Sequence, residues 1–406
     1  MYKELKKTKI ILSSFTPYHM YGLAKYLDEM NLLKILVTNY PYFTIKKYGI
    51  KKSKIISYIS TGVLLNIFRK TPLYHIRLVR KVLSKPMIEY FSEQVKNYVC
   101  NLKENEKIIY WGLSGCSLET LKTVKKRSCV KILDFGSINL EYQKKLMTMH
   151  SINNYVKSID INTWMIDRQN KEINLSDIVL VSSKFSKKSF KMMGFNTNKF
   201  LIKHPNLDLK IFKLKKNIKK LPNYTFLYVG NLGFNKGVES LCEAFNLEFE
   251  NKLANLYLIG GSVDRDYTKF LKNKFSNENI HFLGVTSKKK LVDYYNSADC
   301  TILPSIADGF GKTILESLSC GTPAICSKNV GALDILSKDL YNLSWEPLDI
   351  DNIRKSLNFM YAKREYYIDN RNKLAKEFSI KNYNLRIKKE YELIFKKIND
   401  NLKVKK

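Results

Sequence analysis

The sequence lacks any run of about 20 uninterrupted apolar residues, the length that a membrane-spanning helix requires. Its first 15 residues, MYKELKKTKIILSSF, have a basic start, but the apolar run that follows is short and typical of a strand. Neither a signal-peptide core nor a cleavage site is present in this stretch. We therefore expect a protein of the cytoplasm.

Cysteines at metal-ligand spacing are also missing. The seven cysteines stand singly, mostly in apolar runs, and no CxxC or Cys/His cluster occurs. This pattern argues against a zinc site and predicts buried thiols in a reducing compartment. Two Asp-X-Asp triplets, at 264–266 and 349–351, each precede a helical pattern. We interpret them as acids at helix N-termini rather than as ligands of a metal.

Acidic residues are few relative to basic ones. Lys and Arg number 70 against 37 Asp and Glu, which gives a formal net charge of +33. Such an excess attracts polyanions, namely nucleic acid, an anionic membrane surface or phosphorylated ligands. Much of it consists of Lys pairs beside Asn and Ile, a pattern that compositional bias of a genome also produces. Both explanations of the excess stay open.

Short apolar runs alternate with longer helical patterns along the 406 residues. Near-continuous apolar strands separated by helices are typical of parallel sheets that are covered on both faces. The fold class is therefore α/β, doubly wound, and the length allows two such domains. We expect strands at 9–14, 34–39, 54–59, 107–112, 130–135, 177–183, 199–204, 225–231, 255–261, 280–284, 299–305 and 323–327.

A polar, Lys-rich stretch at 204–223, with proline near each end, marks the expected domain boundary. We expect an N-terminal domain at 1–205 and a C-terminal domain at 206–376. The residues after these, 377–406, carry apolar residues at helical spacing and form a final helix.

The segment FLYVGNLGFNKGVESLCEAF, at 226–245, predicts a strand that ends at Gly230, a loop with Lys236, and a helix. Glycines let a ligand approach the backbone, and a helix N-terminus with a lysine favours a phosphate. An ordinary loop with a solvated lysine explains the same pattern.

The segment PSIADGFGKTILESLSCGTPAI, at 304–325, resembles the end of a P-loop through its GFGKT. A P-loop requires glycine where Ile306 stands, so this interpretation fails. Asp308 and Glu316 lie eight residues apart, about two helical turns, so a ligand along the helix would meet one acid at each end. The alternative is a helix cap and a solvated helix residue.

From VGNLGFNKGVESLCEAF through LIGG to the run IHFLG … GALDIL, the second half resembles retaining glycosyltransferases of the GT-B fold, family four. The resemblance implies two Rossmann-like domains that face a cleft, and a C-terminal helix in 377–406 that crosses back onto the N-terminal domain. It also implies a nucleotide-diphosphate sugar as co-substrate, transfer with retention at the anomeric carbon, and no metal or cofactor.

Residue by residue, the resemblance implies that Asp308 faces the transferred sugar and that Glu316 holds the ribose hydroxyls. The Arg and Lys that hold the diphosphate in the family fall at Asn231 and Lys236, so the Arg is missing here. Its loss removes a bidentate phosphate clamp and leaves either weaker donor binding or another cation, for which Lys312 is the candidate. The remaining donor-side positions are Gly230, Gly309, Phe310 and Gly311.

The N-terminal half resembles the family less closely. The stretch 130–150 is similar to one that faces the reaction centre in a bacterial branch, which makes Asp134, Ser137 and His150 candidates on the acceptor side. His19, in the loop after the first strand, is a further candidate to approach the diphosphate or the acceptor. Polar strand ends and a structural histidine are the alternatives.

The basic amphipathic stretch 63–83 permits two interpretations, a helix pair with a solvated basic face or a segment that lies on an anionic membrane. We therefore expect a cytoplasmic protein, with attachment to the inner face of the membrane as the second option. The expected partners are a nucleotide sugar and a saccharide or lipid-linked acceptor from cell-surface polysaccharide or glycolipid assembly. Two other functions stay open, a catalytically impaired sugar-nucleotide-binding protein and a charge-driven nucleic-acid binder without a specific target.

Overall fold

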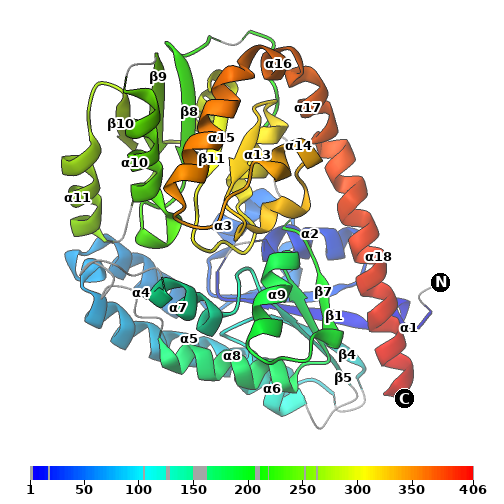
Figure 1. Cartoon of the computed structure of the whole chain (residues 1–406). Coiled ribbons are helices and arrows are strands. Elements are labelled where there is room, and N and C mark those ends of the chain that lie inside the picture. The colour runs from blue at the N-terminus through cyan, green and yellow to red at the C-terminus, as the bar shows by residue number, and fades with distance from the viewer. Residues whose placement is uncertain are drawn as a thin grey trace.

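The structure is a computed structural model that describes residues 3–16, 19–103, 106–124, 129–149, 162–205, 211–217, 219–250, 253–261 and 264–405. Two parallel sheets, each with helices on both faces, lie one above the other in Figure 1. The expectation of an α/β chain with two doubly wound domains is confirmed.

The lower sheet has seven strands in the order β3-β2-β1-β4-β5-β6-β7, and the upper sheet has five in the order β10-β9-β8-β11-β12. Both orders reverse beside their first strand, between β1 and β4 and between β8 and β11. Ligands of such sheets bind outside the carboxyl ends of the strands at this switch point. The strands are β1 Lys9–Ser14, β2 Leu33–Thr38, β3 Ile55–Ser57, β4 Ile108–Leu113, β5 Cys129–Asp134, β6 Ile178–Val181, β7 Phe200–Ile202, β8 Tyr224–Val229, β9 Ala254–Ile259, β10 Ile280–Gly284, β11 Cys300–Leu303 and β12 Ala324–Cys326.

Helices cover the two sheets and connect their strands. Those before β8 are α1 Lys3–Lys6, α2 Met20–Glu29, α3 Tyr42–Ile45, α4 Ile59–Lys70, α5 Arg77–Cys100, α6 Leu118–Thr123, α7 Leu140–Met149, α8 Thr163–Leu175 and α9 Lys184–Met192. Those after it are α10 Val238–Phe249, α11 Arg265–Phe275, α12 Lys288–Ser297, α13 Lys312–Ser319, α14 Lys338–Asn342, α15 Ile350–Ala362, α16 Arg364–Asp369, α17 Arg371–Glu377 and α18 Ile380–Val404. The short 3-10 turns are η1 Lys46–Tyr48, η2 Lys52–Lys54, η3 Pro72–His75, η6 Thr197–Lys199, η7 Phe234–Lys236 and η8 Gly331–Asp334.

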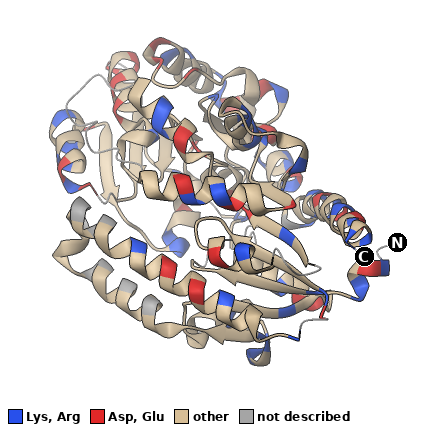
Figure 2. Ribbon diagram, turned by 90° about the horizontal axis from the view of Figure 1, so that it is seen from below, with Lys and Arg blue, Asp and Glu red and all other residues tan. Residues whose placement is uncertain are grey.

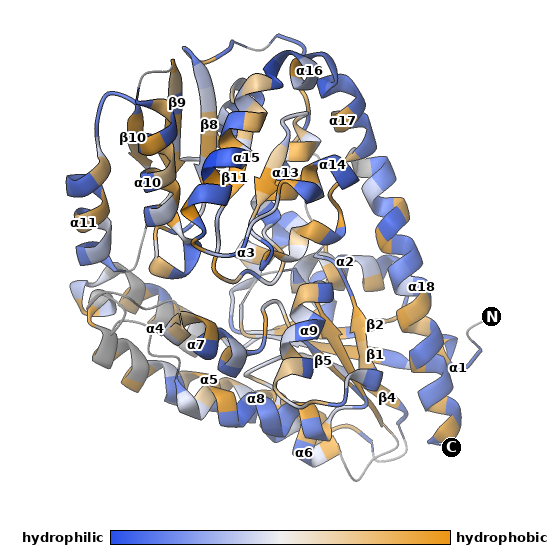
Figure 3. Cartoon of the chain, in the orientation of Figure 1, coloured by the Kyte–Doolittle hydropathy of each residue, from blue (hydrophilic) through white to orange (hydrophobic). Residues whose placement is uncertain are grey.

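The strand β4 shows why these apolar runs fold as buried parallel strands. Ile109 and Trp111 pack into the hydrophobic cluster on one face of the sheet, whereas Ile108 and Tyr110 pack into the cluster on the other face. Since successive side chains of a strand point to opposite faces, a strand that is buried on both sides needs an unbroken apolar run. In Figure 3 the strands are accordingly among the most hydrophobic segments.

The last helix, α18, runs along one side of both sheets (Figure 1). Near its start, the Tyr383 hydroxyl donates a hydrogen bond of 2.7 Å to the carbonyl oxygen of Pro205. Further along, Tyr391 stacks on Tyr26 of α2, and beyond the helix end Lys405 lies 2.6 Å from Asp177. The C-terminus of the chain is therefore anchored on the domain that contains the N-terminus.

Two local expectations were tested by the structure. Asp264 and Asp349 cap the N-termini of α11 and α15 by accepting hydrogen bonds from backbone N–H groups, so the interpretation of both Asp-X-Asp triplets is confirmed. Six cysteines are buried, but Cys100 is exposed at the end of α5, where the expectation of a buried thiol is wrong. No helix in the described ranges combines the length and the apolar character that crossing a bilayer demands.

Candidate active site at the domain interface

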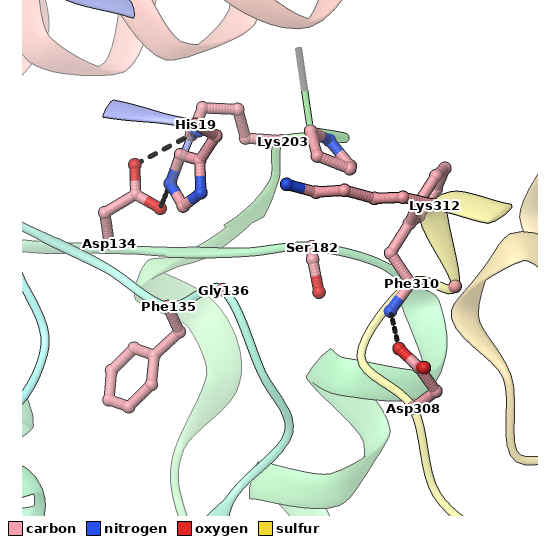
Figure 4. Close-up of a pocket in the computed structure, with 11 residues that line it drawn as sticks. His19, Asp134, Phe135, Gly136, Ser182, Lys203, Asp308, Phe310 and Lys312 are labelled. Carbon is pink, nitrogen blue, oxygen red and sulfur yellow. Dashed lines mark hydrogen bonds and ion pairs between the residues drawn. The ribbon is translucent and has the colours of Figure 1, made fainter. Parts of the chain in front are cut away.

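A cavity of about 270 Å³ lies between the two domains (Figure 4). Its walls come from the loop after β1, from the ends of β5, β6 and β7, and from the loop between β11 and α13. The lining residues are His19, Asp134, Phe135, Gly136, Ser182, Lys203, Pro205, Asp308, Phe310, Gly311 and Lys312. Six of these residues were candidates from the sequence, on both sides of the expected cleft.

Asp134, the last residue of β5, is the anchor of the N-terminal wall. Its Oδ1 lies 2.8 Å from Nε2 of His19, and its Oδ2 lies 3.0 Å from Nε1 of Trp111 and 3.1 Å from Nζ of Lys203. Burial opposes ionisation of this carboxyl, but Lys203 and His19 outweigh it and hold its pKa far below the usual range. Asp134 is therefore a buried carboxylate whose two oxygens are both occupied.

His19 lies at the start of α2, almost completely buried. Burial and the nearby positive charge of Lys203 lower its pKa, so the imidazole is neutral at pH 7. Because its Nε2 faces an ionised carboxylate, this nitrogen carries the proton and donates to Asp134. The other nitrogen, Nδ1, is left without a proton and accepts hydrogen bonds.

On the opposite wall, Asp308 and Lys236 form an ion pair. Nζ of Lys236 lies 2.5 Å from Oδ2 of Asp308, and Oδ1 of Asp308 accepts a hydrogen bond of 3.1 Å from the backbone N–H of Phe310. Burial raises the pKa of Asp308, but Lys236 outweighs this effect and the net shift is downward. Asp308 does not cap α13, because the residue before that helix is Gly311.

Two glycines with left-handed backbones start the helices behind this pair. Gly237, with φ of 63°, precedes α10, and a Cβ atom there would lie 2.1 Å from the carbonyl oxygen of Pro304. Gly311, with φ of 80°, precedes α13 and faces the side chains of Leu303 and Val330. Because glycine alone fits both positions, the two helix N-termini approach the same loop.

Lys312, the first residue of α13, extends its side chain across the cavity (Figure 4). No described residue forms a hydrogen bond or ion pair with its ammonium group. The pKa of Lys312 is lowered, mainly by burial and also by the nearby charge of Lys203. Glu316, one turn further along α13, opposes this shift. A partly desolvated cation without a partner favours an anionic ligand.

Glu316 and the loop after β8 lie beside the cavity and do not line it. Oε2 of Glu316 accepts a hydrogen bond of 3.0 Å from the hydroxyl of Tyr295, and burial raises the pKa of Glu316 to about 7. Gly230 follows β8 and lies against the backbone of Gly260. A Cβ atom at Gly260 would lie 1.8 Å from the carbonyl oxygen of Gly230. Asn231 is exposed.

The donor-side loop touches the N-terminal domain through Gly309. The hydroxyls of Ser182 and Ser183 both donate to its carbonyl oxygen, at 2.8 and 2.7 Å, and a Cβ atom at Gly309 would lie 2.9 Å from Cα of Ser137. The structure thus brings Ser137 and Gly309 together, as two sides of a closed interface. His150 lies outside the described residues.

His204 joins this interface to the last helix. Its Nδ1 lies 2.5 Å from Glu390 of α18, its Nε2 lies 3.3 Å from Asp334, and its ring centroid lies 5.4 Å from that of Phe310. Burial opposes protonation, but the two carboxylates outweigh it and raise the pKa of His204 to about 9. Asp334 also accepts a hydrogen bond of 2.7 Å from the backbone N–H of Lys184, at the start of α9.

Sequence reasoning missed Lys203, Ser182 and Ser183 because nothing in their local pattern separates them from ordinary residues at strand ends. The one signal was position, since each follows a buried strand at the edge where ligands of parallel sheets bind. As for a metal, the described part of the chain brings no three His, Cys, Asp or Glu side chains together in a way that fits an ion.

Residues 210–378 match the family described as glycosyl transferases group 1. The matched residues form most of the C-terminal domain. Over 151 residues, or 36% of this chain, the sequence is 30% identical to an uncharacterized glycosyltransferase, MJ1607, of Methanocaldococcus jannaschii. It is 31% identical over 131 residues, or 31% of this chain, to the O-antigen chain mannosyltransferase B of Escherichia coli. These alignments cover only 39% and 34% of the relatives' own lengths.

Similar solved structures extend over both domains. Sucrose-phosphate synthase from Thermosynechococcus elongatus gives a TM-score of 0.66 at 16% identity, over 96% of this chain and 99% of that one. Anabaena Alr3699/HepE in complex with UDP and glucose gives a TM-score of 0.60 at 14% identity, over 95% and 99%. The chain has the GT-B fold, two parallel-sheet α/β domains in one chain, as the sequence predicted.

Proposed function

We propose that this chain is a glycosyltransferase of group 1. It takes a nucleotide-diphosphate sugar as donor and transfers the sugar, with retention, to an acceptor hydroxyl in the interdomain cavity. The observation that carries the proposal is the ammonium of Lys312, which pairs with none of the described residues and points into the cavity beside the ion pair of Lys236 and Asp308. Two cations and two helix N-termini converge there, and a diphosphate is the ligand that such a site favours. The similar structure with bound UDP and glucose supports a donor of this class.

In the family, an Arg at the position of Asn231 supplies a positive charge to the diphosphate. Lys312 supplies this charge here. Asn231 is exposed and outside the cavity, whereas Lys312 lines it. Together with Lys236 at the start of α10, Lys312 at the start of α13 neutralises the leaving diphosphate. The proposal assigns this role to the two lysines and the helix N-termini instead of a metal ion.

Glu316 binds the nucleoside part of the donor. An ionised carboxylate accepts hydrogen bonds from two neighbouring ribose hydroxyls, and the Tyr295 hydroxyl holds one of its oxygens in place. The base of the nucleotide is left open in this proposal.

In the transfer step, the bond between the anomeric carbon and the diphosphate oxygen breaks, and the acceptor oxygen forms its bond to that carbon on the same face. The proton of the acceptor hydroxyl passes to the departing diphosphate, so charge and atoms balance. Asp308 positions Lys236 and the donor loop in this step, because both of its oxygens are already engaged. It does not act as a nucleophile.

The acceptor binds against the N-terminal wall. Nδ1 of the neutral His19 accepts a hydrogen bond from a sugar hydroxyl, and Asp134 and Lys203 fix the orientation of the ring. A saccharide or a lipid-linked saccharide from cell-surface glycan assembly is the acceptor that we propose. The similarity to an O-antigen chain mannosyltransferase supports it.

The test is a thermal-shift screen with UDP-, GDP- and ADP-sugars, followed by an assay for sugar release from the nucleotide that stabilises best. Stabilisation together with slow hydrolysis or transfer is expected. Stabilisation without any release would favour the second candidate, a sugar-nucleotide-binding protein without activity, which the exposed Asn231 in place of a diphosphate-binding Arg favours. A protein that no sugar nucleotide stabilises would contradict both.

A further inference from the structure

One segment of the N-terminal domain contains no acidic residue. Residues 30–88 include twelve Lys or Arg, and all 37 Asp and Glu of the chain lie outside this segment. Compositional bias toward Lys acts on the whole chain and does not explain the complete exclusion of acids from one part. Figure 2, the view from below, shows the acidic residues spread over the rest of both domains. Lys34 and Lys54 of this segment pair with Glu106 and Asp28, which lie outside it. The exposed lysines that the structure describes in the segment are Lys46, Lys47, Lys51, Lys52 and Lys85. The segment therefore presents exposed positive charge without an acidic residue of its own.

The helix α4 within this segment exposes an apolar face. Ile59, Val63, Leu64 and Ile67 are 44, 42, 60 and 58% exposed, and their spacing places them on one side of the helix. The other side is fixed to the domain, since a Cβ atom at Gly62 would lie 1.8 Å from the carbonyl oxygen of Asn39. α4 is thus a well-anchored helix whose outer face is apolar.

The apolar face continues beyond α4 into its neighbours. The turn η3 packs against both α4 and α5, and Leu73, Ile76, Val82 and Leu83 of η3 and α5 are 40 to 63% exposed. We name the connected surface the α4–α5 face. It comprises Ile59, Val63, Leu64, Ile67, Leu73, Ile76, Val82 and Leu83. In Figures 1 and 3 these elements lie on the side of the molecule opposite α18, below the C-terminal domain.

We propose that the α4–α5 face docks the protein on the surface of an anionic phospholipid bilayer. Apolar side chains at this density on a surface helix mark an interaction site. In the interface of a bilayer they enter the boundary between head groups and acyl chains, while Lys and Arg of the same segment attract anionic head groups. This inference goes beyond the proposed function and does not depend on it.

The positive charge of the segment favours an anionic bilayer over the other possible partners of the α4–α5 face. A second copy of the chain would bring two segments of the same charge sign together, which opposes association. Nucleic acid binds through phosphate contacts and has no use for eight exposed aliphatic side chains. An anionic bilayer matches both the charge and the apolar surface.

Docking through this face places the cleft beside the bilayer. α4 begins directly after β3, where the N–H of Tyr58 donates to the carbonyl oxygen of Thr38 at the end of β2. That end of the sheet is the one whose neighbouring strands line the cavity. A lipid-linked acceptor in the membrane surface would then reach the N-terminal wall without leaving the bilayer.

The experiment is sedimentation of the full chain with vesicles of phosphatidylcholine alone or mixed with phosphatidylglycerol. The protein should bind the mixed vesicles, bind the neutral ones weakly, and release with added salt. The double variant Leu64→Ser/Ile67→Ser should bind the mixed vesicles roughly tenfold less, because its apolar insertion is reduced. The matched control is Leu385→Ser/Leu393→Ser on α18, where the two leucines are 53 and 64% exposed, and it should bind normally.

Three outcomes would overturn the inference. In the first, the unmodified protein does not bind mixed vesicles at low salt. In the second, both double variants bind equally. In the third, the protein is a dimer in solution that only Leu64→Ser/Ile67→Ser dissociates. The third outcome would assign the face to a second copy. Val82→Ser/Leu83→Ser on α5 provides an independent variant if the first one unfolds. Since no donor is present in the assay, its result is independent of whether the proposed enzymatic function is correct.

Discussion

The ammonium of Lys236 lies 2.5 Å from Oδ2 of Asp308, although 71 residues separate the two in the chain. The pair connects the loop before α10 to the loop before α13 and holds both helix N-termini toward one point of the cavity. In the free protein the two charges satisfy each other. In the proposed function, Lys236 would exchange part of this contact for the diphosphate when the donor binds.

Replacing Lys236 with Ala should lower kcat about 10²- to 10³-fold, because a preorganised charge at the leaving group is lost. The free energy of unfolding should fall by up to about 3 kcal/mol, because the mostly buried Asp308 loses the cation that offsets its burial. Steady-state kinetics and chemical denaturation measure the two effects. Lys274→Ala is the matched control, because Lys274 pairs with Glu239 on the same domain away from the cavity. Normal turnover of Lys236→Ala would contradict the proposed role.

Replacing Lys312 with Met should weaken donor binding at least about tenfold and raise the melting temperature. The first effect follows from the loss of a charge-assisted contact to phosphate, and the second from removal of a partly desolvated cation without a partner. Calorimetry and thermal unfolding measure them separately. The double variant Lys312→Met/Asn231→Arg should regain part of the affinity, because it restores the cation at the family's position. Unchanged affinity of the single variant would exclude Lys312 from the donor site.

Donor binding should strengthen as pH rises from about 6 to about 8. The pKa of Glu316 is raised to about 7 by burial, and only its ionised form accepts both ribose hydroxyls. In Glu316→Gln the affinity should be lower and independent of pH over the same interval. Tyr295→Phe should keep the pH dependence and lose a part of the affinity. A pH dependence that persists in Glu316→Gln would assign the titration to another group.

The contact of His204 with Asp334 and Glu390 predicts a loss of stability at high pH. The pKa of His204 is raised from 6.5 to about 9 in the folded state, so folding favours the protonated imidazole. The stabilisation is complete below pH 6.5 and disappears as pH rises through 9, by up to about 3 kcal/mol. Urea unfolding at several pH values measures it. In His204→Gln this part of the pH dependence should vanish, and a profile identical to that of the unmodified protein would contradict the assignment.

Most of the strands were predictable from the sequence because burial on both faces requires an apolar run, which is visible without any tertiary information. The donor loop was predictable for a different reason, since its glycines and acids have fixed spacing along one segment. The residue contacts between the two domains were not predictable from the sequence. Ser183 and Gly309 lie 126 residues apart, and only the packing of two domains brings them into contact.

The exposure of apolar side chains on surface helices was also not predictable from the sequence. The basic amphipathic stretch 63–83 predicts a helix pair, but its pattern does not distinguish a face that meets the core from one that meets solvent. Only the tight approach of Gly62 to Asn39 identifies which side of α4 is buried. The same ambiguity explains Cys100, whose apolar neighbours suggested burial although it ends the helix in solvent.

The last helix has a consequence for how the cleft opens. The chain crosses between domains twice, once after β7 and once at α18, and His204 with Glu390 ties the two crossings to each other. An opening motion that keeps both crossings intact must be a rotation about a line near this junction. The two serine contacts to Gly309 and the contact of Lys184 with Asp334 then separate together. If the proposed function holds, release of the spent nucleotide through this opening requires these hydrogen bonds to break.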